Sequence, residues 1–98
     1  MEISVYTTGK LRIGRIMMPK LVKKKTLPQY YEAVIHRDKF FELRKDEDDI
    51  QVGDGLVLQE WDGSAYTGRE IGFLVRYVLR NAAEYGLMEG YCIIGWGV

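Results

Sequence analysis

The segment KFFELR, which begins at Lys39, places a cation, a carboxylate and a guanidinium within one short stretch. If this segment is a strand, Glu42 and Arg44 share one face, because side chains alternate along a strand. Phe41 and Leu43 would then point the other way, into the core. Such groups can bind a phosphate and the edge of a base. Residue types alone favour a simpler hypothesis, in which an ion pair orders the strand and contributes at most about 1 kcal/mol.

Three consecutive lysines, Lys23, Lys24 and Lys25, form the second candidate. They could contact the phosphates of a nucleic acid, and binding would then weaken with salt. Lysines on an edge strand also prevent sheets from joining edge to edge, which is the simpler explanation. The net charge is zero, but residues 1–25 carry a balance of +6 and residues 26–62 a balance of −6. This asymmetry fits either an anionic partner or a basic strand that pairs with an acidic loop.

Aromatic residues near these charges could stack on a base. Phe40 would share a face with Glu42 and Arg44, and Trp61 and Tyr66 flank a predicted turn. A small domain must also fill its interior, so most of its rings are expected in the core.

Two further charged groups have mainly structural interpretations. Arg69, Arg76 and Arg80 could extend a basic surface, but such residues are more often a solvated face. The acidic run at residues 46–49 lacks the glycine and the distal glutamate of a calcium loop, so a solvated loop is expected there.

The content of cysteine and histidine limits the chemistry. One Cys and one His exclude an internal disulfide bond and the common Cys/His zinc sites, so we expect no metal and no cofactor. Catalysis through a Ser-His or Cys-His pair would depend on His36 alone, and Cys92 lies in an apolar strand, so we assign no catalytic residue. Basic residues interrupt the N-terminus before a signal sequence can form, and no apolar run approaches a membrane span. A cytoplasmic protein is expected.

The length of 98 residues allows a single domain. Hydrophobic residues alternate with a period of two, which predicts strands. The expected strands lie at residues 3–6, 11–17, 40–44, 56–61, 71–80 and 91–96, the first two within an N-terminal extension over residues 1–20.

One segment breaks this alternation. Pro28 suits the first turn of a helix, and Tyr31, Val34 and Ile35 recur at helical spacing up to about His36. The sequence Asp-Gly-Ser at 62–64 predicts a hairpin turn. The expected fold is mainly β (α+β), a small barrel of five to seven strands with one or two short helices, because closure removes exposed edges.

Several motifs occur together in an order that resembles the DUF3850 domain, a branch of the ASCH group in the PUA-like superfamily. The resemblance covers about residues 22–95 and implies a PUA-like β-barrel with a ligand cleft lined by the Lys-x-x-Glu-x-Arg motif. Where the ASCH signature usually has glycine, two residues before the lysine, this chain has Arg37. The motifs are Pro28-Gln29-Tyr30-Tyr31, Lys39 to Arg44, Val52-Gly53-Asp54, Glu60-Trp61, Tyr66-Thr67-Gly68-Arg69 and Gly90-Tyr91.

The resemblance favours a nucleic-acid-binding module, with RNA or a nucleotide-like ligand as the expected partner. The alternatives are a small hydrolase that acts on a modified nucleoside and a protein-binding adaptor. In one ASCH-like branch an amidohydrolase uses a Lys, a Thr and a Glu; Lys39 matches the first, but Glu42 stands at the position of the Thr. The expected binding residues are Lys25, Lys39, Phe40, Glu42, Arg44, Tyr66 and Arg69.

Overall fold

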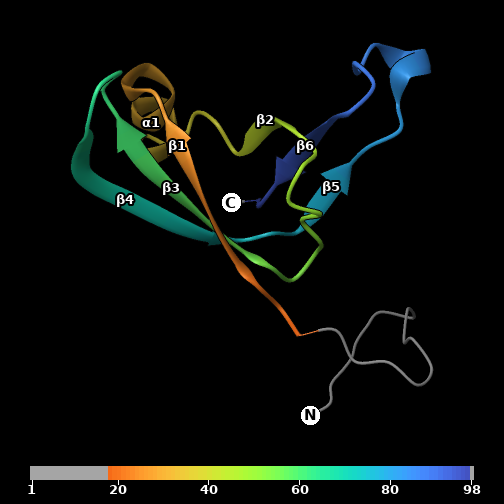
Figure 1. Ribbon diagram of the computed structural model, residues 1–98, viewed down its shortest axis with the longest axis horizontal. Helices are drawn as coiled ribbons and strands as arrows, with labels where there is room; N and C mark the ends of the chain where they lie inside the picture. Colours follow the sequence, from red (N-terminus) through yellow and green to blue (C-terminus); the bar gives the residue numbers. More distant parts are fainter. Residues whose placement is uncertain (1–17, 98) are drawn as a thin grey trace.

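A computed structural model describes residues 18–97, which form six strands, one α-helix and a short 3-10 turn (Figure 1). The predictions of a mainly β fold and a single α-helix are confirmed within this part of the chain. The two strands predicted at residues 3–6 and 11–17 lie outside the described residues. In chain order the elements are β1 (Leu21–Thr26), α1 (Pro28–Ile35), β2 (Phe41–Lys45), β3 (Gly55–Trp61), β4 (Tyr66–Leu74), β5 (Tyr77–Leu79), the 3-10 turn (Ala83–Tyr85) and β6 (Tyr91–Gly95).

The strands form two three-stranded sheets, in the orders β1-β3-β4 and β2-β6-β5. β1 runs parallel to β3, and the other pairs are antiparallel. Over residues 18–97 no strand pairing closes the two sheets into a barrel, so the closed barrel stays a prediction.

The segment predicted as one strand over residues 71–80 is two strands in different sheets, which corrects that prediction. The chain leaves the first sheet at Val75, whose N–H donates to the carbonyl of Asp54, and Arg76 then donates to the carbonyl of Gly95 in the second sheet. Val75 is buried, whereas Tyr77 is 63% exposed, so the alternation ends where the chain bends.

The core lies between the two sheets and α1. It includes Leu56 and Leu58 of β3, Cys92 and Ile94 of β6, and Val34 of α1, all of them buried. Burial of such side chains is the main favourable contribution to folding, roughly 1.5–3 kcal/mol for each large aliphatic residue.

The helix begins at Pro28 as predicted, because proline fits the first turn, where no N–H is needed. Tyr31 and Val34 are buried, and His36 caps the carboxyl end. The hairpin between β3 and β4 is also confirmed. Asp62 accepts hydrogen bonds from the backbone N–H groups of Ser64 and Ala65, and the positive φ of Gly63 closes the turn.

The inner and outer faces of β2 are exchanged relative to the prediction. Glu42 is 4% exposed and faces the interior, whereas Phe41 and Leu43 are 47% and 56% exposed on the outer face. The alternation itself is correct, but the expectation that apolar side chains take the inner face is wrong. The reason is that Glu42 has two cationic partners on the inner side, which compensate for the loss of its hydration.

The turn before β3 depends on a second buried carboxylate. Gly53 has a φ of 101°, and Asp54 accepts hydrogen bonds from the backbone N–H groups of Lys20 and Gln51 and from Lys20 Nζ at 2.8 Å. Burial alone would raise the pKa of Asp54, but the hydrogen bonds from Lys20 and Gln51 outweigh it and hold that pKa below its ordinary value of 3.8.

We expect Asp54→Asn to lower the free energy of unfolding by about 1–2 kcal/mol at neutral pH, because the ion pair and one acceptor are lost. The pKa of Asp54 is lower in the folded protein than in the unfolded chain, so its ionised carboxylate stabilises the fold. This stabilisation is complete above the ordinary pKa of Asp and is lost as the pH falls through the folded-state pKa. The difference between wild type and variant should therefore shrink below about pH 4. Urea unfolding at several pH values checks this, with the exposed Asp38→Asn as control. A difference that persists unchanged at low pH would contradict it.

Candidate functional site

The carboxylate of Glu42 joins the two cations that the sequence analysis singled out. Lys39 Nζ donates to Glu42 Oε2 at 2.7 Å, and Arg44 Nε donates to Glu42 Oε1 at 3.0 Å. Lys39 Nζ also donates to the carbonyl of Phe41, and both cationic side chains are mostly buried. The predicted convergence of Lys39, Glu42 and Arg44 is thus observed, and we call these residues the Glu42 cluster.

Arg44 also connects the two sheets. Its Nη2 donates to the carbonyl of Lys25 and, at 3.2 Å, to the hydroxyl of Thr26, both at the carboxyl end of β1. β1 and β2 are edge strands of different sheets, so this side chain bridges their edges where no backbone ladder does so within residues 18–97. Arg44 can reach β1 because the β2–β6 register places Glu42 and Arg44 on the same inner face, opposite Ile94 and Cys92.

A third buried carboxylate, that of Glu60, lies at the end of β3 next to the carboxyl end of β1. Glu60 is 5% exposed and accepts hydrogen bonds from Arg69 at 2.9 and 3.0 Å and from Thr67 at 2.7 Å. Arg69 also donates to Glu32 at 2.6 Å and lies over the ring of Tyr31. Hydrogen bonds from Arg69 and Thr67 lower the pKa of Glu60, and the two carboxylates raise the pKa of Arg69.

Arg69 is therefore held by Glu60 and Glu32 rather than presented as a free cation. In the sequence, Glu60 stands out only as part of a motif, and no local pattern distinguishes Thr26. The register of β3 and β4 shifts between Gln59 and Trp61, and the spacing of the motif alone does not reveal this shift.

Lys25 and Tyr66 meet on the outer face of the first sheet. Lys25 Nζ lies 3.8 Å from the centre of the Trp61 ring and 5.7 Å from that of Tyr66. The two rings contact each other edge to face, with their centres 5.0 Å apart. Lys25 thus links the Glu42 cluster to the aromatic pair. Its carbonyl accepts a hydrogen bond from Arg44, and its ammonium group lies over the ring of Trp61.

Phe40 packs against the core, on the inner side that Glu42 also faces, but it lies outside the Glu42 cluster. It precedes β2 and lines a pocket between α1 and the two sheets. That pocket is not formed by Lys39, Glu42 or Arg44, so the cleft expected over those three residues stays a prediction.

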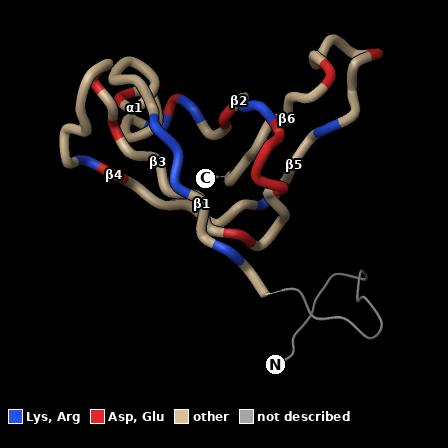
Figure 2. Tube along the Cα trace, in the orientation of Figure 1, with Lys and Arg blue, Asp and Glu red and all other residues tan. Residues whose placement is uncertain are grey.

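Much of the charge asymmetry is neutralised within the fold. Lys24 Nζ pairs with Asp48 at 2.7 Å and with Glu47 at 3.4 Å, and Arg80 forms two hydrogen bonds with Asp46. Figure 2 shows the basic stretch along β1 and the acidic segment that follows β2. The basic strand therefore pairs with the acidic loop, and of the three lysines Lys24 is already engaged.

The single cysteine and the single histidine are both engaged within the fold. Cys92 is buried, and burial raises the pKa of its thiol, which disfavours the reactive thiolate. His36 lies at the end of α1 and pairs with Glu32 at 3.0 Å. Among residues 18–97, His, Cys, Asp and Glu side chains form no group of three that could hold a metal ion. None of the helices in the same range is long and apolar enough to cross a membrane.

A family model described as "Domain of unknown function (DUF3850)" matches residues 22–96. This chain belongs to the DUF3850 family. The matched span begins within β1 and ends just after β6, so both sheets and all three buried carboxylates belong to the DUF3850 domain.

The chain is also similar to a protein of Escherichia phage P2 named "Uncharacterized 12.9 kDa protein in GpA 3'region". The two are 34% identical over 55 residues, which is 56% of this chain and 50% of the phage protein. The match thus spans about half the length of this curated relative, whose name states no activity or ligand.

We expect Glu42→Gln to lower the free energy of unfolding by about 2 kcal/mol, because two cations with little access to water lose their counter-charge. The matched control is Glu84→Gln, an exposed position that should change stability by less than about 0.5 kcal/mol. Urea unfolding measures both. Equal stability of E42Q and E84Q would show that the carboxylate does not hold the cluster together.

Proposed function

We propose that this DUF3850 domain is an RNA-binding module of the ASCH type, which recognises its ligand across the β1 edge. The interacting surface runs from Lys39 and Arg44 of the Glu42 cluster to Lys25 and the Trp61–Tyr66 pair. The observation that carries the proposal is the ion network around Glu42, which fixes two cations beside an exposed aromatic surface.

The network leaves hydrogen-bond donors for a ligand. Lys39 has three N–H donors, and the carbonyl of Phe41 and the carboxylate of Glu42 accept two of them. Arg44 uses Nε and Nη2 within the fold, and no hydrogen bond from Nη1 occurs among residues 18–97. The buried carboxylate thus positions these cations without consuming all their donors, which suits phosphate binding by preorganised groups.

The aromatic pair supplies the second element of single-strand recognition. Tyr66 is 52% exposed, and Lys25 lies over the neighbouring indole of Trp61. Stacking of a base on such a ring is tolerant of sequence, and a nearby lysine can contact the adjoining phosphate. A single strand that crosses the β1 edge would reach both groups through Lys25.

The same proposal includes the PUA-like barrel. In the proposed ring β1-β3-β4-β5-β6-β2, two neighbouring strand pairs have no backbone ladder within residues 18–97. One is β1 and β2, which the Arg44 side chain bridges, and the other is β4 and β5, which the chain joins through Val75 and Arg76. Hydrolysis is the weaker alternative, because Glu42 is engaged by two cations and the single thiol is buried.

We expect a short single-stranded RNA to bind with a log–log salt slope near −2, for about three phosphate contacts at roughly −0.7 each. Lys25→Gln should weaken binding and flatten the slope by about 0.7. Fluorescence anisotropy over a range of salt concentrations measures this. A single substitution is preferable to replacing all three lysines, because Lys24 also pairs with Asp48.

The control is Lys45→Gln, which lies on the outer face of the other sheet and should leave the slope unchanged. An absence of RNA binding would refute the proposed function. A slope that responds equally to K25Q and K45Q would show that binding is nonspecific and does not use the β1 edge.

A further inference from the structure

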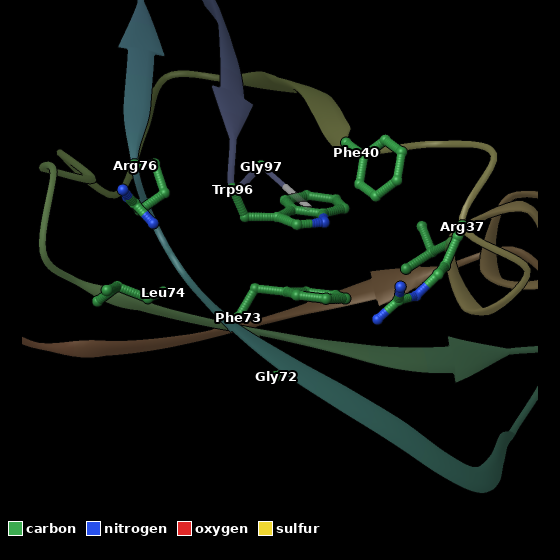
Figure 3. A pocket seen from close by; sticks show the side chains of 9 residues that line it. Arg37, Phe40, Gly72, Phe73, Leu74, Arg76, Trp96 and Gly97 are labelled. Carbon is green, nitrogen blue, oxygen red and sulfur yellow. The ribbon is translucent and has the colours of Figure 1, made fainter.

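A pocket of about 310 Å³ opens between the end of α1, strand β4 and the residues that follow β6 (Figure 3). It is separate from the surface proposed for RNA, because Lys25, Lys39, Glu42 and Arg44 do not line it. Its volume lies at the lower end of the range found for small-molecule sites, roughly 300–1,000 Å³.

One wall of the pocket is aromatic. The rings of Phe73 and Trp96 are stacked with their centres 4.4 Å apart and their planes 13° from parallel. Phe40 lies across from this pair, as Figure 3 shows. Trp96 is only 5% exposed, so the core holds the wall rigid. A rigid aromatic surface suits a planar ring, because little conformational freedom is lost on binding.

Two arginines flank this wall. Arg37 at the end of α1 and Arg76 between β4 and β5 line the pocket on either side of the stacked rings (Figure 3). Within residues 18–97, neither has a carboxylate within ion-pair distance. The other arginines there are all paired, namely Arg44 with Glu42, Arg69 with Glu60 and Glu32, and Arg80 with Asp46.

The backbone at Arg37 supplies an independent observation. Its φ is 64°, in the left-handed region that follows many helices and that glycine adopts most easily. An arginine there carries a conformational penalty that glycine would avoid. Its side chain makes no hydrogen bond or ion pair with residues 18–97 that would offset the penalty. A strained residue that lines a pocket is a common feature of binding sites.

We propose that this pocket binds a phosphate monoester attached to a planar ring, that is, a nucleoside monophosphate, either free or at the phosphorylated end of an RNA strand. Arg37, on one side of the stacked rings, would neutralise the phosphate and donate hydrogen bonds to its oxygens, since guanidinium groups match phosphate geometry. Arg76, on the other side, would donate to acceptor atoms at the edge of the planar ring. The ring would pack on the wall of Phe73 and Trp96. This inference does not rest on the RNA-binding proposal, because it uses other residues and a small ligand.

The test is a titration of the 15N-labelled protein with adenosine 5′-monophosphate, followed at the indole N–H of Trp96. The chain has two tryptophans, so Trp61→Phe assigns the signal. We expect saturable shifts at the Trp96 indole and at the amides of Phe73 and Arg76. Adenosine and inorganic phosphate, each tested alone, should bind more weakly than the monophosphate. A short RNA with and without a 5′-phosphate distinguishes a strand end from a free nucleotide as the source.

Two substitutions separate binding from folding. Arg37→Gly should weaken nucleotide binding about tenfold, through the loss of one charge-assisted contact, while its thermal midpoint stays equal to that of wild type or rises. Arg76→Gln should weaken binding to a similar extent, and the Lys45→Gln control should leave it unchanged. The RNA salt slope should remain intact in R37G, so the two proposals can fail separately. No shift at Trp96, or nucleotide binding by R37G equal to that of wild type, would overturn the inference.

Discussion

The burial of Glu42 is the constraint on which the arrangement of the two sheets depends. A carboxylate that is 4% exposed must be compensated, and Lys39 and Arg44 provide that compensation from positions three residues before and two residues after it. Because Arg44 is then fixed, its Nη2 reaches the carbonyl of Lys25 and the hydroxyl of Thr26 across the gap between the sheets. One buried charge thus orients β2, connects it to β1 and places two cations beside the β1 edge.

A similar solution appears at the end of β3, where Glu60 is buried and held by Arg69 and Thr67. Glu60 lies opposite Thr26 in the β1–β3 register, so the two buried carboxylates lie on either side of the carboxyl end of β1. Figure 1 shows the ends of β1 and β3 beside α1. A buried ion pair contributes little net stability compared with well-packed apolar side chains. Here the two ion-pair networks place oriented cations and aromatic rings at one end of the fold.

Local patterns determined which parts of this structure the sequence could predict. Proline at position 28 and helical spacing up to Ile35 were sufficient for α1, and Asp-Gly-Ser after Trp61 was sufficient for the hairpin. The shared face of Glu42 and Arg44 also followed from spacing, because strand residues two apart share a face. Lys39 precedes β2, so strand spacing did not determine its direction.

The misjudged features depend on partners distant in the sequence. Glu42 faces inward because Lys39 and Arg44 compensate its charge there, and Arg44 in turn contacts β1, whereas hydrophobicity alone places Phe41 and Leu43 inside. Val75 is buried, as the alternation over 71–80 predicts, but the chain changes its pairing partner after Val75 and Tyr77 is exposed. Period-two alternation does not encode such a change from one sheet to another. The positive φ of Arg37 is likewise visible only in the structure.

The most direct test of this account is a map of backbone amide shifts as a short single-stranded RNA is added to the 15N-labelled protein. The account predicts that the largest shifts cluster at Lys25 and Thr26, along residues 39–44, and at Trp61 and Tyr66, with little change in the distant 3-10 turn Ala83–Tyr85. Shifts that are absent at saturating RNA, or that concentrate in that turn and spare β1 and β2, would contradict it.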